Sequence, residues 1–299
     1  MFCGHCGEKN LEQYRFCFEC GARLYAIRAG GDEPIVDELS ARLQGLRQLP
    51  EPRIDWPEGL DQTQISVDGS RLLLVPAGFF WMGTQKQKKD ERPCRLVYLD
   101  SYYIDETPVT NQQYAEFLTK KGGRKPAGFS KHRHASDWDQ LPVTGVTWHE
   151  ACEYARWAQK RLPTEAEWEK AARGIDRRLW PWGDEEPAPE HAHLGVDLEA
   201  PAAVKHHEKG RSPYGALGMA GNVWEWCQDQ YDQFFYPRSP PRNPCCTDGD
   251  HRYRVLRGGA FGYSAFTARV SFRGWNLPDM RSSCYGFRCA VNPRGSASS

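Results

Sequence analysis

Residues 221–226 read Gly-Asn-Val-Trp-Glu-Trp, and this stretch decides how the chain is organised. Trp224 and Trp226 are two positions apart, so in an extended strand their indoles share one face and Glu225 points the other way. This pattern predicts a strand that enters a core. Asn222 and Glu225 supply hard oxygens close in sequence, and backbone carbonyls at a bend could complete a calcium shell. The alternative is a buried indole pair in which Asn222 only turns the chain.

The composition describes a loop-rich globular protein whose core relies on aromatic side chains. The chain has 11 Trp, 28 Gly and 21 Pro. Its length of 299 residues is enough for one large domain and a small appendage. The formal net charge is zero, so nothing steers the molecule to nucleic acid or to an anionic membrane. No apolar run approaches ~18 residues and no signal peptide is visible, so we expect a cytoplasmic protein without a membrane span.

Two Cys-x-x-Cys pairs lie at the N-terminus: Cys3 with Cys6, and Cys17 with Cys20. Four thiolates at this spacing predict a closed structural zinc site, and zinc binding would order so short a segment. The alternative of two redox pairs lacks the surrounding βαβ pattern. Residues 1–24 therefore read as a zinc ribbon that docks to a protein or oligomerises. The seven other cysteines read as reduced thiols.

Regular elements are predicted along the rest of the chain. Residues 25–64 form a linker with one amphipathic helix that begins after Pro34, residues 65–293 form the main domain, and residues 294–299 form a disordered tail. We expect strands over Arg71–Val75, Phe79–Met82, Leu96–Leu99 and Tyr102–Ile104. Three capping boxes predict helices over Asn111–Lys120, Trp148–Gln159 and Glu165–Arg173, the last closed by Gly174. After it we expect only short strands and turns.

Residues ~65–292 resemble the formylglycine-generating enzyme (sulfatase-modifying factor) family. The resemblance is carried by Val75–Gly83, Pro108–Asn111, Pro142-Val143, Lys160–Gly174, Pro181–Gly183, Gly218–Trp226, Arg257–Gly259 and Gly286–Arg288. It implies an α+β, C-type-lectin-like fold with two helices and a twisted antiparallel sheet under long loops. It also implies calcium binding by Asn222, the Val223 carbonyl and Glu225. A second calcium site of the family is in doubt, because Ala192-His193-Leu194 stands where an Asn is expected.

Enzymes of this family hold copper(I) between two cysteines a few residues after Gly-Gly, since soft thiolates suit that ion. Aligned on Gly258-Gly259, those positions hold Tyr263 and Ala268, and no Cys lies between Cys246 and Cys284. Formylglycine generation is therefore not expected, and we assign no catalytic residue. The related sulfoxide synthases bind iron through three His of an added helical domain. The close pairs His132/His134 and His206/His207 lie in polar loops, where solvated histidine is the default.

Residues 260–285 alternate aromatics with Ser, Gly and Thr, a composition typical of recognition surfaces. We predict a ligand surface made of Gly262, Tyr263, Ser264, Phe266, Thr267, Phe272, Trp275, Asn276, Met280, Ser282, Ser283 and Cys284. Phe261 is expected to fill the core. Arg269, Arg273 and Arg281 are expected to bond loop carbonyls and carboxylates.

The same stretch resembles the variable region of retroelement-diversified C-type-lectin proteins. In such regions adenine-rich codons are rewritten and end in a pyrimidine, so they cannot encode Lys, Glu, Gln, Met or Trp. These five residue types number 62 in the 299-residue chain, so about 5 would be expected in 26 residues. Two occur, Trp275 and Met280. The sequence thus favours a non-catalytic module that binds a protein or small-molecule ligand. The alternative is an oxygen-dependent oxidoreductase whose metal is not visible in the sequence.

Overall fold

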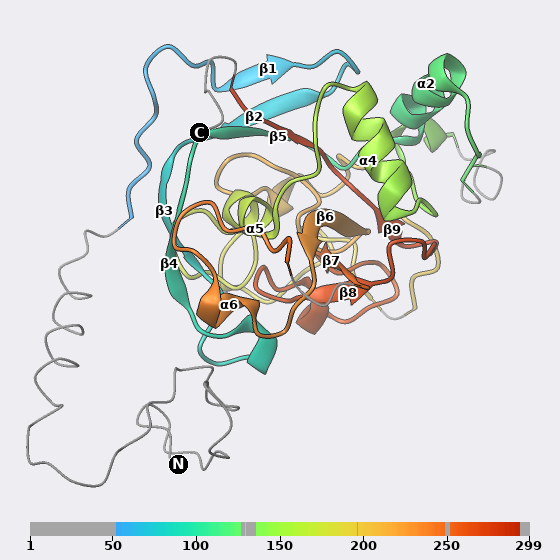
Figure 1. The fold of residues 1–299 in the computed structure, drawn as a ribbon. Helices are drawn as coiled ribbons and strands as arrows, with labels where there is room; N and C mark the ends of the chain where they lie inside the picture. Colours follow the sequence, from blue (N-terminus) through green and yellow to red (C-terminus); the bar gives the residue numbers. More distant parts are fainter. Residues whose placement is uncertain (1–51, 127–128, 130–135, 196, 249–251, 294–299) are drawn as a thin grey trace, which may run out of the picture.

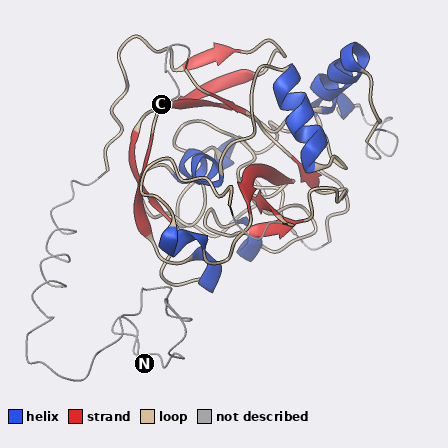
Figure 2. Cartoon of the chain, in the orientation of Figure 1, coloured by secondary structure: helices blue, strands red, loops and turns tan. Residues whose placement is uncertain are grey.

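The computed structural model describes residues 52–126, 129, 136–195, 197–248 and 252–293. The predicted zinc ribbon with Cys3, Cys6, Cys17 and Cys20, the helix after Pro34, the pair His132/His134 and the tail at 294–299 lie outside the described residues. Much of the described chain is loop and turn (Figure 2). Helices and strands nevertheless both occur, so the predicted α+β class is confirmed.

Two antiparallel arrangements lie along the top and the left edge of the domain in the view of Figure 1. The first is a four-stranded sheet in the order β1 (Thr63–Ile65), β2 (Arg71–Val75), β5 (Tyr102–Asp105) and β10 (Ala290–Val291). The second is the pair β3 (Gly78–Met82) and β4 (Arg95–Leu99). Because β10 pairs with β5 near the end of the chain, the sheet ties the two ends of the domain together.

The other four-stranded sheet has the order β8 (Gly274–Asn276), β7 (Arg254–Arg257), β6 (Trp224–Gln230) and β9 (Tyr285–Gly286). β6 runs parallel to β9 and antiparallel to β7, and β8 is an edge strand. Buried side chains form two main clusters, one with Trp168 and Val255 and the other with Trp224 and Leu256. Since Val255 and Leu256 are neighbours on β7, this sheet separates the two clusters.

Three longer helices begin where the capping boxes predicted: α2 (Asn111–Lys121), α4 (Trp148–Trp157) and α5 (Glu165–Arg173). α4 ends two residues before the predicted end, because Gln159 adopts a left-handed φ of 56°. A one-turn helix, α6 (Phe235–Arg238), and four 3₁₀ turns complete the helical elements of the described ranges.

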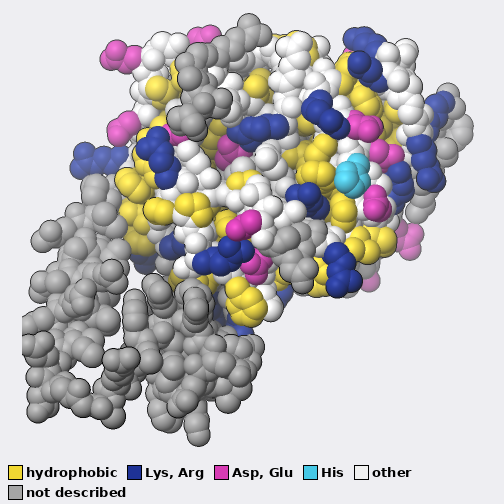
Figure 3. All heavy atoms as spheres, in the orientation of Figure 1, with side chains coloured by type: hydrophobic (Ala, Val, Ile, Leu, Met, Phe, Trp, Pro, Cys, Tyr) yellow, Lys and Arg dark blue, Asp and Glu magenta, His cyan; other side chains and the backbone are white. Residues whose placement is uncertain are grey.

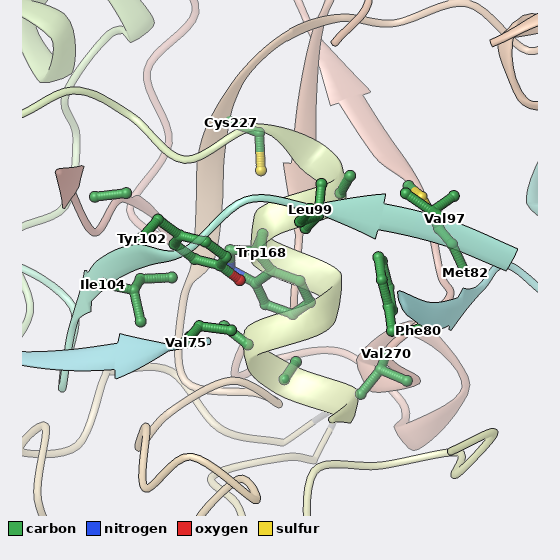
Figure 4. Packing of buried hydrophobic residues seen from close by; sticks show 14 of the residues in the cluster. Val75, Phe80, Met82, Val97, Leu99, Tyr102, Ile104, Trp168, Cys227 and Val270 are labelled. Carbon is green, nitrogen blue, oxygen red and sulfur yellow. The ribbon is translucent and has the colours of Figure 1, made fainter. Parts of the chain in front are cut away.

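All residues of α5 are buried, and this helix lies at the centre of the molecule (Figure 1). Its Trp168 packs in the core with Val75, Phe80, Leu99 and Tyr102 (Figure 4). Gly174 closes α5 with a φ of 78°, as predicted. Because α5 is fully buried, its charged side chains need partners inside the protein.

Replacing Thr164 by alanine should lower the free energy of unfolding by about 1 kcal/mol. The Thr164 hydroxyl accepts a hydrogen bond from the Glu167 amide at 3.1 Å, which satisfies one free N–H of the first turn of α5. Thr119→Ala on the exposed side of α2 is the matched control, with an expected change below about 0.5 kcal/mol. Urea unfolding followed by tryptophan fluorescence measures both, and equal losses would show that the cap is unimportant.

Candidate functional site

Strand β6 positions a buried ion pair at the Gly-Asn-Val-Trp-Glu-Trp stretch of residues 221–226. Glu225 and Arg288 are both fully buried, with Arg288 Nε 2.6 Å and Nη2 2.8 Å from the two carboxylate oxygens of Glu225. The Trp168 indole N–H donates to the same carboxylate at 2.7 Å. Arg288 also donates to three backbone carbonyls, those of Asp105, Glu106 and Leu217. The family motif at Gly286-Phe287-Arg288 is thus the counter-ion of the motif at 221–226.

The two indoles behave as the alternation predicted. Trp224 and Trp226 belong to one buried cluster, while Glu225 contacts Trp168 of the other. The predicted division of this strand into an indole face and a carboxylate face is confirmed.

Asn222 uses its side chain to clamp a neighbouring loop. Its φ of 63° places it in the left-handed region. The Asn222 amide accepts from the Ala202 N–H and donates to the Ala202 carbonyl, both at 3.0 Å. Asn222 and Glu225 therefore face different partners rather than a common point. Because Arg288 and Trp168 occupy the Glu225 carboxylate, the residues as they lie do not fit a calcium ion around Asn222, Val223 and Glu225.

The two positions that carry copper-binding cysteines in the resembling family are far from equivalent here. Tyr263 is 39% exposed, whereas Ala268 is fully buried. Tyr263 packs edge-on against Trp224 with 5.7 Å between ring centroids, and its hydroxyl neighbours the Cys284 thiol. Burial raises the pKa of Cys284, so this thiol is protonated at neutral pH. A phenol, a methyl group and a single thiol do not supply the pair of sulfur ligands that copper(I) needs in a linear dithiolate site.

Around Tyr263 the structure gathers an aromatic surface, which we call the Tyr263 face and define by Tyr263, Phe266, Phe272 and Asn276. Phe272 contacts Trp224 and Phe266, with ring centroids 5.8 and 5.6 Å apart. The Lys88 ammonium lies 4.7 Å from the Phe272 ring centre. Asn276 donates to the Tyr285 hydroxyl at 2.7 Å, which fixes its amide on the same side of the sheet. The face therefore combines rigid rings with fixed polar groups.

Trp275 lies on the other side of β8. A Cβ added at Gly274 would meet the Trp224 ring at 2.9 Å, so Gly274 faces Trp224 and its neighbour Trp275 faces away. Trp275 packs on Tyr253 and Tyr231, with centroids 4.5 and 5.5 Å apart. We call these three rings the Trp275 face. Since β8 is the edge strand, the Tyr263 and Trp275 faces meet along that edge.

The other predicted surface residues differ in exposure. Gly262, Ser264, Met280 and Ser283 are exposed, Thr267 and Ser282 are half-buried, and Cys284 is buried. Cys284 thus lies beneath Tyr263 and does not form part of the outer surface.

The predictions for core and basic residues are confirmed. Phe261 is buried. Arg269 binds Glu91 through both terminal nitrogens, Arg273 binds Glu165, and Arg281 binds Glu150 and the Gly145 carbonyl. These arginines hold the loops that carry the aromatic surface.

Some members of the surface escaped sequence reasoning. Tyr231 and Tyr253 come from the loops that flank β6 and β7, and Lys88 comes from the connection between β3 and β4. No local pattern links these positions to residues 262–284. The alternation of Gly274, Trp275 and Asn276 is the one signal that could have predicted the division into two faces.

Histidines do not assemble a metal centre in the described residues. The His206 and His207 rings lie 4.8 Å apart, and His207 bonds the Pro189 carbonyl at 2.7 Å. Within these ranges, no group of three or more His, Cys, Asp or Glu side chains is arranged to hold a metal ion. None of the helices there combines the length and apolar character needed to span a bilayer.

Comparison with known proteins gives clear relatives. The chain is 35% identical over 296 residues to the hercynine oxygenase of Mycolicibacterium smegmatis, covering 85% of this chain and 68% of that protein. It is 34% identical to the formylglycine-generating enzyme of Streptomyces coelicolor, covering 72% of this chain and 87% of that enzyme. It is 35% identical to the serine/threonine-protein kinase pkn1 of Chlamydia pneumoniae, but spans only 38% of that protein's length.

Solved structures share the fold. PvdO from Pseudomonas aeruginosa superposes with a TM-score of 0.66 and 23% identity over 77% of this chain and 97% of that one. Treponema denticola variable protein 1 superposes with a TM-score of 0.62 and 23% identity over 82% and 100%. The family model described as the sulfatase-modifying factor enzyme 1-like domain matches residues 59–293. The chain therefore belongs to the sulfatase-modifying factor enzyme 1-like domain family, with its C-type-lectin-like fold.

Proposed function

We propose that this domain is a non-catalytic recognition module whose ligand binds along the β8 edge, at the Tyr263 and Trp275 faces. One observation carries the proposal. Ten large hydrophobic side chains are exposed in the described residues, and five of them lie within residues 263–280: Tyr263, Phe266, Trp275, Leu277 and Met280. Apolar side chains scattered among charged ones, as Figure 3 shows on one side of the molecule, need no explanation, but five exposed ones within 18 residues are typical of a binding site.

The surroundings of these rings support the proposal. Arg269 and Arg273 are buried and paired with carboxylates, and the partly buried Arg281 is paired with Glu150, so the loops are held while the rings project outward. A rigid scaffold with adaptable polar neighbours such as Ser264 and Asn276 suits recognition of a protein or small-molecule ligand. Residues 260–285 contain few Lys, Glu, Gln, Met and Trp residues. We therefore include in the proposal that this stretch is the variable region of a retroelement-diversified protein. Repeats of the 3′ coding segment that differ at adenines would support it.

Alanine replacement of Tyr263 and Phe266 together should weaken ligand binding at least ~30-fold, because even one exposed aromatic anchor at a binding centre contributes about 2 kcal/mol or more. The unfolding midpoint should hardly change, since both rings are partly exposed. The probe is a random dodecapeptide phage library selected on the full chain. Selected clones are then measured on wild type, on the double variant and on Phe234→Ala.

Phe234 is a matched control because it is 50% exposed and lies outside the proposed surface. Clones that bind the double variant as tightly as wild type would place the binding site elsewhere. Trp275→Ala then reports whether a ligand also contacts the second face of β8. Loss of folding in either variant would instead assign those rings to the core.

The N-terminal cysteines add a second element to the proposal. We expect Cys3, Cys6, Cys17 and Cys20 to hold one zinc ion and to dock a protein partner, in a cytoplasmic setting that keeps the remaining thiols reduced. Metal analysis of the purified full chain should give one zinc per chain, falling to zero in the Cys3→Ser/Cys6→Ser variant.

A second candidate function, an oxygen-dependent oxidoreductase, is favoured by the 35% identity to a hercynine oxygenase. Metal-dependent oxygen uptake in the presence of thiol substrates would support this candidate. The geometry around Tyr263 supports the recognition module better, because among the described residues Cys284 alone brings a thiol to that position.

A further inference from the structure

A cleft of about 460 Å³ lies between the turn after β3 and the segment after α5. Its walls include Thr84, Lys86, Cys94, Arg173, Arg177 and Ser271. A volume of this size suits a small molecule. None of the functions considered above uses it.

The floor of the cleft is fixed by packing that requires a glycine. Gly83 has a φ of 80°, and a Cβ added there would lie 2.6 Å from the Glu91 carbonyl oxygen. The buried Arg173 donates to the Gly83 carbonyl at 3.0 Å and contacts Glu169 at 3.1 Å. The cleft is therefore a preformed feature, which lowers the cost of ordering a ligand.

The charges in the cleft do not balance. Arg173 is paired with Glu169, and Arg178 makes an ion pair with Asp176 at 2.6 Å. In the part of the chain that the structure describes, Arg177 and Lys86 make no ion pair: the Arg177 guanidinium lies over the Trp81 ring at 4.0 Å, and Lys86 is exposed. Among the residues that line the cleft, Asp184 is the one carboxylate available to balance the charges of Arg177 and Lys86.

Asp184 is itself engaged, because it accepts the Leu179 amide at 2.8 Å. Arg177 stacked on an indole keeps its N–H fork available, and such a fork recognises planar carboxylates and phosphates. Gln85 and Gln87 in the same wall supply neutral amide groups. We propose that this cleft binds a small organic anion that carries a carboxylate or phosphate group, with Arg177 and Lys86 as its cationic contacts.

Cys94 provides a reporter inside the cleft. It is a half-buried free thiol in the wall, and burial raises its pKa. Iodoacetate and iodoacetamide alkylate a thiol in the same way but differ in charge, so the ratio of their rates at one cysteine measures the local attraction for an anion. Peptide mass spectrometry after limited alkylation of the full chain gives this ratio for Cys94 separately from the other cysteines.

The ratio of iodoacetate to iodoacetamide labelling at Cys94 should fall about 5-fold or more in Arg177→Gln/Lys86→Gln, as expected for the loss of about 1 kcal/mol of charge attraction. Both side chains are exposed, so the fold should be retained. Arg124→Gln, an exposed arginine that does not line this cleft, is the matched control and should leave the ratio unchanged. Cys152, which lines a separate cleft, should also be unaffected.

Inorganic phosphate and acetate, added separately at matched ionic strength with chloride, should slow labelling of Cys94 by neutral iodoacetamide. Stronger protection by one of the two assigns the cleft to phosphate or to carboxylate ligands. An unchanged rate ratio in the double variant, or no protection by either anion beyond that of chloride, would overturn the proposal. Neither result depends on the aromatic surface.

Discussion

Replacing Arg288 by methionine is expected to lower the free energy of unfolding by about 3–5 kcal/mol, the cost of leaving a buried charge without its partner. The substitution removes both hydrogen bonds to Glu225 and those to the carbonyls of Asp105, Glu106 and Leu217. Glu225 then keeps only the Trp168 indole as a donor, in a site with no exposure to water. Urea unfolding monitored by tryptophan fluorescence measures the loss.

Arg242→Met is the matched control for this experiment. Arg242 contacts Asp100 at 2.6 Å, as close as the buried pair, but its side chain is 63% exposed. An exposed pair contributes at most about 1 kcal/mol, so the two losses should differ severalfold. Equal losses in the two variants would show that burial of the Glu225–Arg288 pair has no special importance.

The same geometry bears on calcium. Because Glu225 is held by Arg288, we expect wild-type protein to unfold at the same urea concentration in calcium and in EDTA. A calcium-dependent rise in stability that disappears in Glu225→Gln would instead restore Glu225 as a calcium ligand.

The second large effect is expected at Lys160. This buried ammonium contacts Asp68 at 2.8 Å, Asp105 at 2.7 Å and the Ser70 hydroxyl at 2.5 Å. Lys160→Met leaves two buried carboxylates without a cation, so we expect a loss of about 3–5 kcal/mol at neutral pH. The variant Asp68→Asn/Lys160→Met should recover part of this loss, because one buried charge is then removed.

The pH dependence of Lys160→Met gives a sharper test. In the wild type, burial acts to raise the pKa of Asp68, but the interactions of its carboxylate, first of all with Lys160, together outweigh burial and hold this pKa below its usual value. The native state therefore binds fewer protons than the unfolded chain. This part of the stability is present above pH ~4 and is lost as the pH falls. Without the ammonium, burial dominates and the Asp68 pKa should rise, so that stability falls as the pH increases from ~4 to ~7. A variant with the wild-type slope would contradict the account.

Local signals predicted the regular elements well. The three capping boxes gave the first residue of each helix, and Arg71–Val75 was predicted with the bounds that the structure shows. These features depend on contacts within a few residues, which one sequence displays directly. The end of α4 was less predictable, because Gln159 takes a left-handed conformation that no residue type in that segment demands.

Long-range pairings explain what the sequence could not predict. The local pattern predicted Glu225 as a calcium ligand but did not reveal that Arg288, 63 residues away, binds the same carboxylate. The alternation along Gly274–Asn276 indicates that neighbouring side chains point to opposite sides of the strand. Which side carries which aromatic residues follows only once the position of Trp224 is known. Exposure of Tyr263 and Phe266 and burial of Phe261 followed from composition and spacing. Lys88 reaches Phe272 only through the packing of the β3–β4 connection.

Oxygen uptake by the full chain tests the central claim, that Tyr263 and Ala268 have replaced a redox-metal site with a recognition surface. The protein is incubated with a cysteine peptide and either copper(I) or iron(II), and an oxygen electrode records the rate of oxygen consumption. Tyr263→Ala separates chemistry at this position from adventitious metal on other cysteines. After subtraction of the uptake by metal and peptide without protein, we predict the same slow uptake with and without added metal, and the same rate in the variant. Rapid metal-dependent uptake that Tyr263→Ala abolishes would contradict the account.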